Sequence, residues 1–134
     1  MENTALLLID LQNDYFESFE NAKWKLKNTE EAASNALKLL NKFREKNMKI
    51  IHVKHEFNME NPPFFAPNSQ GAKIHDSVTP KENEAQVLKH DVNSFKNTNL
   101  KEILDDSNIT NVIIVGAMSY MCVTAVTRAA SDFG

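Results

Sequence analysis

The sequence predicts an α/β fold of three layers, in which a parallel sheet of about four strands lies between helices. Residues 4–10 (TALLLID) and 112–115 (VIIV) have the nearly continuous apolar character of strands buried on both faces of a parallel sheet. Between them, strand and helix patterns follow one another in the order β-α-β-loop-β-α-β-α. Connections of this kind are right-handed crossovers, which place helices on both faces of the sheet.

The composition is typical of one small globular domain. The chain has 134 residues, of which 42% are hydrophobic and 25% charged, and its formal net charge of −3 argues against nucleic acid as a partner. A single cysteine excludes an intramolecular disulfide and fits a reducing compartment. The sequence has no signal peptide pattern and no apolar run near the roughly 20 residues that a membrane helix needs. We therefore expect a single cytoplasmic domain over residues 1–134.

A long amphipathic helix is predicted over residues 29–46. Asn28 and Glu31 have the spacing of a capping box, and Asn47 is expected to end the helix in a left-handed conformation. The apolar residues recur at helical spacing and form one stripe, which consists of Ala33, Ala36, Leu37, Leu40 and Phe43.

Two more strands and a short helix complete the predicted elements. Residues 49–53 (KIIHV) predict a second strand that runs on toward His55, and residues 86–90 (QVLKH) predict a third. Residues 97–106 predict a short helix that Thr98 would cap.

Two long loops are expected to determine substrate specificity. Residues 11–27 have no clean period, and residues 56–80 are rich in proline and aromatic residues. Loops of this length inside a compact domain are usually functional. Phe16, Trp24 and Tyr120 are candidate pocket residues, although aromatic side chains are more often part of the core.

Three chemically useful side chains follow predicted strands. Asp10 ends the first strand, Lys89 lies near the carboxyl end of the third, and the only cysteine, Cys122, lies in the first turn of a helix that begins near Ser119. Ligands of open α/β sheets bind at the carboxyl ends of the strands. The helix N-terminus is expected to lower the pKa of the thiol and to offer N–H groups to an oxyanion. A carboxylate beside an ammonium could take the proton of the thiol, so we expect a cysteine hydrolase.

Each of these residues also has a structural interpretation. A lone cysteine in an apolar helix is more often structural than catalytic, and Lys89 considered alone would be a surface lysine. His52 and His55 are three residues apart on a strand and point to opposite faces, so they cannot share a metal ion. We predict no metal site and no cofactor.

Four segments carry a resemblance to a known family: LLLIDLQNDYF, GAKIHDSVTP, VLKHDVNSFKNTNL and VIIVGAMSYMCVTAVTRAASDFG. In this order, over nearly all of the chain, they resemble the isochorismatase-like cysteine hydrolases, which include nicotinamidases and N-carbamoyl amidohydrolases. The resemblance implies their Rossmann-like α/β/α fold. It also implies hydrolysis of an amide, carbamoyl or ureido C–N bond in a small molecule, through a thioester acyl-enzyme.

The resemblance assigns roles to individual residues. It implies Asp10 as general base, Lys89 as its partner and Cys122 as nucleophile. It also implies a cis peptide between Ala117 and Met118, and an oxyanion hole made by the backbone N–H groups of Met118 and Cys122.

The chain departs from the family pattern in two respects. Family domains continue with further strands and helices, so we expect the domain to be C-terminally incomplete, or another chain, as in a homo-oligomer, to pair with the edge of residues 112–115. Nicotinamidases carry an Asp-x-His metal motif after the second strand, where this chain reads HVKHEF, so a metal-binding nicotinamidase is disfavoured.

Other functions compete with cysteine-dependent hydrolysis. A catalytically silent, truncated family member that acts as a binding or assembly module is the main alternative. A phosphatase of the haloacid dehalogenase type is rejected, because Gln12 stands where that chemistry needs a second aspartate. An isochorismatase-type ether hydrolase is less favoured than an amidase, because the cysteine is retained.

Overall fold

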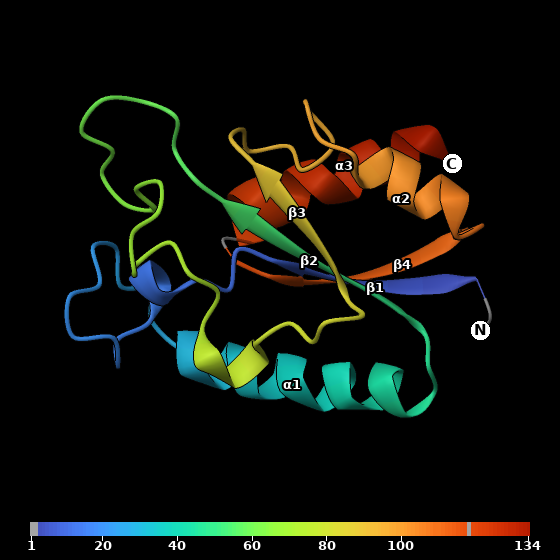
Figure 1. The fold of residues 1–134 in the computed structure, drawn as a ribbon, viewed down its shortest axis with the longest axis horizontal. Helices are drawn as coiled ribbons and strands as arrows, with labels where there is room; N and C mark the ends of the chain where they lie inside the picture. The colour runs from blue at the N-terminus through green and yellow to red at the C-terminus, as the bar shows by residue number, and fades with distance from the viewer. Residues whose placement is uncertain (1–2, 118) are drawn as a thin grey trace.

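The computed structural model describes residues 3–117 and 119–134, and for Ser119 and Tyr120 it describes the backbone. A parallel sheet of four strands contains β1 (Thr4–Ile9), β2 (Lys49–His55), β3 (Ala85–Lys89) and β4 (Asn111–Gly116) in the order β3-β2-β1-β4. Helices cover both faces, with α1 on one side and α2 and α3 on the other (Figure 1). The predicted three-layer α/β/α architecture is confirmed.

β1 lies at the centre of the sheet, and every one of its side chains is buried. Alternate residues of a strand point to opposite faces, so β1 contributes to two separate cores. Leu7 packs with α2 and α3 in one core, and Leu6 and Leu8 pack with α1 in the other. The apolar run at the start of the chain is therefore buried because both faces of its strand are covered.

The helix α1 (Thr29–Glu45) buries its predicted stripe, but its N-terminus differs from the prediction. Asn28 adopts a left-handed conformation with φ 63° and its side chain makes no capping hydrogen bond, so the predicted capping box is wrong. Instead, the Thr29 hydroxyl donates to the Leu26 carbonyl over 2.9 Å. At the other end Asn47 has φ 53°, which confirms the predicted left-handed stop.

On the opposite face lie α2 (Leu100–Asp106) and α3 (Thr124–Phe133). α2 begins later than predicted, because the Thr98 hydroxyl accepts a hydrogen bond from the Leu100 N–H and itself donates to the Ser94 carbonyl. Thr98 therefore caps the turn before the helix.

β4 is an edge strand in the described part of the chain, where it pairs only with β1. Its apolar side chains are half-buried and pack against both cores, Val112 and Ile114 on one face and Ile113 and Val115 on the other. That a further strand, from this or another chain, pairs with β4 stays a prediction.

The two long loops pack against each other at one end of the sheet. They contain the short 3-10 helices η1 (Asn13–Tyr15) and η2 (Asp76–Val78) and share an aromatic core that includes Tyr15, Phe64 and Phe65. Over the described residues, no helix is long and apolar enough to cross a membrane.

Candidate active site

The carboxyl end of β1 positions Asp10. The residue has φ 55°, a left-handed conformation in which the strand cannot continue, and its N–H donates to the Val53 carbonyl over 3.0 Å. This turn places the carboxylate in the interior, where Asp10 is fully buried. Burial raises the pKa of this carboxyl, and the Lys89 ammonium and the Cys122 thiol both interact with it and act to lower the pKa.

Lys89 is the last residue of β3 and is also fully buried. Its Nζ lies 3.4 Å from Oδ2 of Asp10 and donates a hydrogen bond to the Val92 carbonyl over 2.9 Å. Both charges lie in the protein interior, where an ammonium is found only when it is paired. The structure thus brings together two of the three predicted site residues.

Cys122 lies in a π-helix, Ser119–Val123, that leads from β4 into α3. The cysteine is buried, and its Sγ, one carboxylate oxygen of Asp10 and one ring nitrogen of His55 all lie within 4.8 Å of one another. Thus Asp10, Lys89 and Cys122 converge at one end of the sheet. π-Helical turns are rare and are frequently found at functional sites.

Gly116 makes the turn toward Cys122 possible. It has φ 150°, and a β-carbon at this position would lie 2.1 Å from the carbonyl oxygen of Ile9. The neighbouring Ala117 N–H donates to that same oxygen over 3.0 Å. The backbone of this turn therefore lies directly against the end of β1, where only glycine fits.

The electrostatics of the site favour a protonated thiol. Burial, reinforced by the negative charge of Asp10, raises the pKa of Cys122 to about 12, although Lys89 opposes this effect. The expectation that the helix N-terminus lowers this pKa is therefore wrong, because burial and the charge of Asp10 raise it more than Lys89 lowers it. Burial also raises the pKa of Asp10, and Lys89 counteracts it.

His55 and Gln12 belong to the site but were absent from the predicted set. His55 is buried, its Nδ1 lies 4.0 Å from Oδ2 of Asp10, and burial lowers the pKa of its imidazole to about 4. The Gln12 side chain donates to the carbonyls of His55 and Ala72 and accepts from the His55 N–H. The signal in the sequence was the position of His55 at the end of the second strand.

Asp14 joins the two long loops. Its carboxylate accepts hydrogen bonds from the backbone N–H groups of Lys23 (3.0 Å) and Phe65 (2.8 Å), and it is almost completely buried. Close contact of Gly71 with this carboxylate leaves no room for a side chain there. One residue thus fixes the positions of both segments that were predicted to determine specificity.

The predicted pocket residues have mixed outcomes. Phe16 is fully buried and stacks on His75 with ring centroids 3.7 Å apart, so it is a core residue and offers no surface to a ligand. Trp24 is 48% exposed and contacts Phe64. The Tyr120 side chain, the peptide between Ala117 and Met118, and the Met118 N–H lie outside the described residues.

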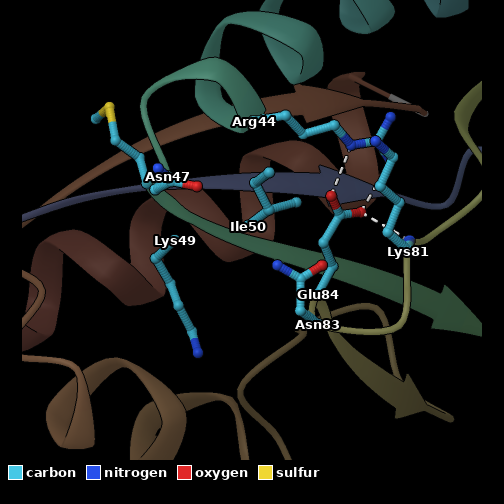
Figure 2. Close-up of a pocket in the computed structure, with 8 residues that line it drawn as sticks. Arg44, Asn47, Lys49, Ile50, Lys81, Asn83 and Glu84 are labelled. Carbon is cyan, nitrogen blue, oxygen red and sulfur yellow. Dashed lines mark hydrogen bonds and ion pairs between the residues drawn. The ribbon is translucent and has the colours of Figure 1, made fainter.

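A separate polar cluster occupies the amino end of β2 and the approach to β3. Glu84 forms a two-fold hydrogen-bonded ion pair with Arg44 and also binds Nε2 of His52 over 2.8 Å. Figure 2 shows this ion pair in the wall of a groove of about 580 Å³ that Lys49 and Lys81 also line. His52 and His55 therefore have different partners, as their spacing predicted.

Comparisons with known proteins identify the family. The pattern of the isochorismatase domain matches residues 4–134. The chain belongs to the isochorismatase family. It is 44% identical to the uncharacterised isochorismatase family protein YddQ of Bacillus subtilis, covering 98% of this chain and 71% of that protein. It is 38% identical to the secreted isochorismatase effector Isc1 of Verticillium dahliae, covering 99% of this chain and 67% of the effector.

Solved structures agree with this assignment. An isochorismatase hydrolase from Oleispira antarctica superposes with a TM-score of 0.96 at 56% identity, over 99% of this chain and 70% of that one. N-carbamoylsarcosine amidase from Thermoplasma acidophilum superposes with a TM-score of 0.85 at 21% identity, which shows the shared fold alone. Isochorismatase-family proteins are hydrolases, so this chain carries a hydrolase domain.

Proposed function

We propose that this isochorismatase-family chain hydrolyses an amide, carbamoyl or ureido C–N bond of a small molecule, with Cys122 as nucleophile. The observation that carries the proposal is the convergence of a buried carboxylate, a buried ammonium and a buried thiol at one end of the sheet. Moving a charged group from water into the protein interior costs several kcal/mol, about 3 or more for each ion. A purely structural core would use apolar residues at these positions instead.

In the first half of the reaction, Sγ of Cys122 attacks the carbonyl carbon while Asp10 takes the thiol proton. The high pKa of Cys122 means that the proton leaves during the attack, and Asp10 is a stronger base than an ordinary aspartate because burial raises its pKa. Asp10 then protonates the departing nitrogen. The C–N bond breaks, and a thioester forms on Cys122.

In the second half, Asp10 takes a proton from water, whose oxygen attacks the thioester carbon. The C–S bond breaks, Sγ recovers the proton, and the acid is released. Lys89 keeps Asp10 ionised at the start of each half-reaction, since its charge lowers the pKa of the carboxyl. The backbone N–H of Cys122, together with that of Met118, is the proposed oxyanion hole.

The substrate is proposed to be uncharged or weakly polar at the group next to the scissile bond. The rings of Phe57 and Phe65 lie 4.5 and 6.1 Å from the His55 ring, so part of the surroundings of the site is aromatic. A relative that is 27% identical over 94% of this chain, streptothricin hydrolase of Streptomyces noursei, hydrolyses streptothricin, as its name states. That relative supports a small-molecule substrate for the proposed reaction.

The experiment is a turnover assay with streptothricin, N-carbamoylsarcosine and nicotinamide, using the wild-type protein and Cys122→Ala. Turnover of any one by the wild-type protein, lost in a folded Cys122→Ala, supports the proposal. Equal turnover by the variant would exclude the cysteine mechanism. No turnover of a wider amide and ureide panel would favour a silent family member, as the name "probable inactive nicotinamidase" indicates for an Arabidopsis thaliana relative.

A further inference from the structure

Beyond hydrolysis, we propose that Asp10, His55 and Cys122 form a binding site for a soft divalent cation such as Zn²⁺, and that the bound cation switches the hydrolase off. In this site Asp10 and Cys122 act as metal ligands instead of base and nucleophile. The third ligand is His55, which has no part in the proposed reaction. The inhibitory effect rests on the proposed function, whereas the binding of the cation does not.

The geometry of the three side chains is suited to such a cation. One donor atom from each of the three lies within 4.8 Å of the others. In a tetrahedral zinc site, bond lengths of about 2.0–2.3 Å put the donors roughly 3.3–3.8 Å apart. Closing the remaining distance takes movements of about 1 Å, which small side-chain rotations provide. Sulfur, imidazole nitrogen and carboxylate oxygen together form a common donor set for zinc.

The donors are also available. His55 is 3% exposed, and its Nδ1 lies 4.0 Å from Oδ2 of Asp10. Both oxygens of Asp10 are buried, and the neighbours of this carboxylate are the Lys89 ammonium and the Cys122 thiol. Buried polar atoms are seldom left without well-aligned partners, so the buried carboxylate of Asp10 between a thiol and an imidazole is a candidate cation ligand. A bound cation would satisfy all three side chains at once.

Gln12 holds His55 in this position. Its side chain binds both the N–H and the carbonyl of His55, and the ring of Phe57 packs on the imidazole with centroids 4.5 Å apart. A ligand fixed in this way loses little conformational freedom when it binds an ion.

Lys89 limits the affinity without preventing binding. Its ammonium lies on Oδ2 of Asp10, so the cation is expected to use the other carboxylate oxygen. The Lys89 ammonium also donates a hydrogen bond to the Val92 carbonyl over 2.9 Å, so it has a second partner besides Asp10. With a deprotonated cysteine, the two negative charges of the ligands exceed the single positive charge of the lysine. The sequence-based expectation of no metal site weighed histidine pairs and the Asp-x-His motif, and it did not consider this combination.

Cobalt tests the site without any substrate. Titration of the wild-type protein with Co²⁺ is expected to produce a thiolate-to-cobalt charge-transfer band and to release about one proton per ion bound, from the Cys122 thiol. Cys122→Ser should abolish the band. His55→Phe, which keeps the aromatic packing but has no nitrogen, should weaken binding by about tenfold or more. His55→Asn provides a second test if the larger ring disturbs the fold.

The matched control is His75→Phe, which removes a histidine that stacks on Phe16 and keeps an aromatic ring there, and it should bind Co²⁺ like the wild type. A missing thiolate band, or equal affinity of the wild type and both folded His55 variants, would overturn the proposed site. Competition by Zn²⁺ for the bound cobalt supports it. Because none of these readouts needs turnover, they separate a failed metal site from a failed hydrolase mechanism.

Discussion

Nζ of Lys89 lies 3.4 Å from Oδ2 of Asp10, and both side chains are completely excluded from solvent. The two residues come from strands that are not adjacent, since β2 lies between β1 and β3. Lys89 therefore crosses the end of β2 to reach the carboxylate. This pair fixes the charge of the proposed general base and connects the stability of the fold with its chemistry.

Replacement of Lys89 by methionine is expected to make stability fall as the pH rises. Without the ammonium, burial raises the pKa of Asp10 further above the 3.8 of a free aspartate. A raised folded-state pKa contributes stability below the unfolded value, and that contribution is lost as the pH rises through the folded value. At neutral pH the free energy of unfolding should decrease by about 3–5 kcal/mol, measured by urea unfolding across a pH series.

Lys101→Met is the matched control for this variant. Lys101 forms an exposed ion pair with Asp105, so the same substitution there should cost less than about 1 kcal/mol. Equal losses in the two variants, or a Lys89→Met protein whose stability has the pH dependence of the wild type, would mean that the buried pair does not control Asp10.

Alkylation of the resting protein should report the high pKa of Cys122. With a pKa of about 12, the thiol is almost entirely protonated at neutral pH. Since the thiolate is the reactive form, iodoacetamide should label Cys122 more slowly than free cysteine, and the rate should continue to rise above pH 9 (roughly the pKa of an ordinary thiol). The labelling rate is measured by mass spectrometry between about pH 6 and 10, because free thiols titrate within this range. Fast labelling with a plateau near neutral pH would indicate a preformed thiolate, and with it a different mechanism.

Gly116→Ala is expected to destabilise the protein more than any ordinary glycine-to-alanine change. The new methyl group would meet the Ile9 carbonyl oxygen, and φ 150° is strained for alanine. The loss should exceed about 1 kcal/mol in thermal or urea unfolding. Gly134→Ala is the control for strain alone, because its φ of 84° also disfavours alanine but a β-carbon there has open space, so it should cost less than Gly116→Ala. Equal stability of the two variants would contradict the close approach of the turn to β1.

The Glu84 cluster predicts acid sensitivity. Burial acts to raise the pKa of Glu84, but hydrogen bonds from Arg44, the Lys81 backbone and His52 outweigh it and lower the pKa to about 2. A lowered pKa contributes stability above the unfolded value of 4.5, which is lost as the pH falls through the folded value. Glu84→Gln should reduce the free energy of unfolding at neutral pH by about 2 kcal/mol. It should also weaken the fall of this free energy at acidic pH, which is called the acid limb.

Glu82→Gln is the control for the Glu84 variant, because Glu82 is exposed and only two residues away in the sequence. Urea unfolding between pH 2 and 6 (about the range in which carboxyl groups titrate) distinguishes the two. An acid limb in Glu84→Gln as steep as in the wild type would show that other carboxyl groups cause it.

The sequence predicted the layers, the strands and the three convergent residues, because these follow from apolar runs and from the rule that parallel strands end on one side. Positions that depend on tertiary contacts were not predictable in this way. The pKa of Cys122 rises because neighbouring elements exclude water, which no local pattern records. Phe16 is a core residue because His75 stacks on it from the other loop. Gln12 and Asp14 act through hydrogen bonds to distant backbone groups, and no motif marks such bonds.

The most direct test of the central claim is intact-protein mass spectrometry after rapid acid quenching of the protein with a substrate that it turns over. We expect a covalent acyl adduct that peptide mapping places on Cys122 and that is absent from Cys122→Ala. Asp10→Asn should slow its formation by at least about a hundredfold, because the general base is lost. Turnover that proceeds unchanged in Cys122→Ala, or an adduct on another residue, would contradict the account.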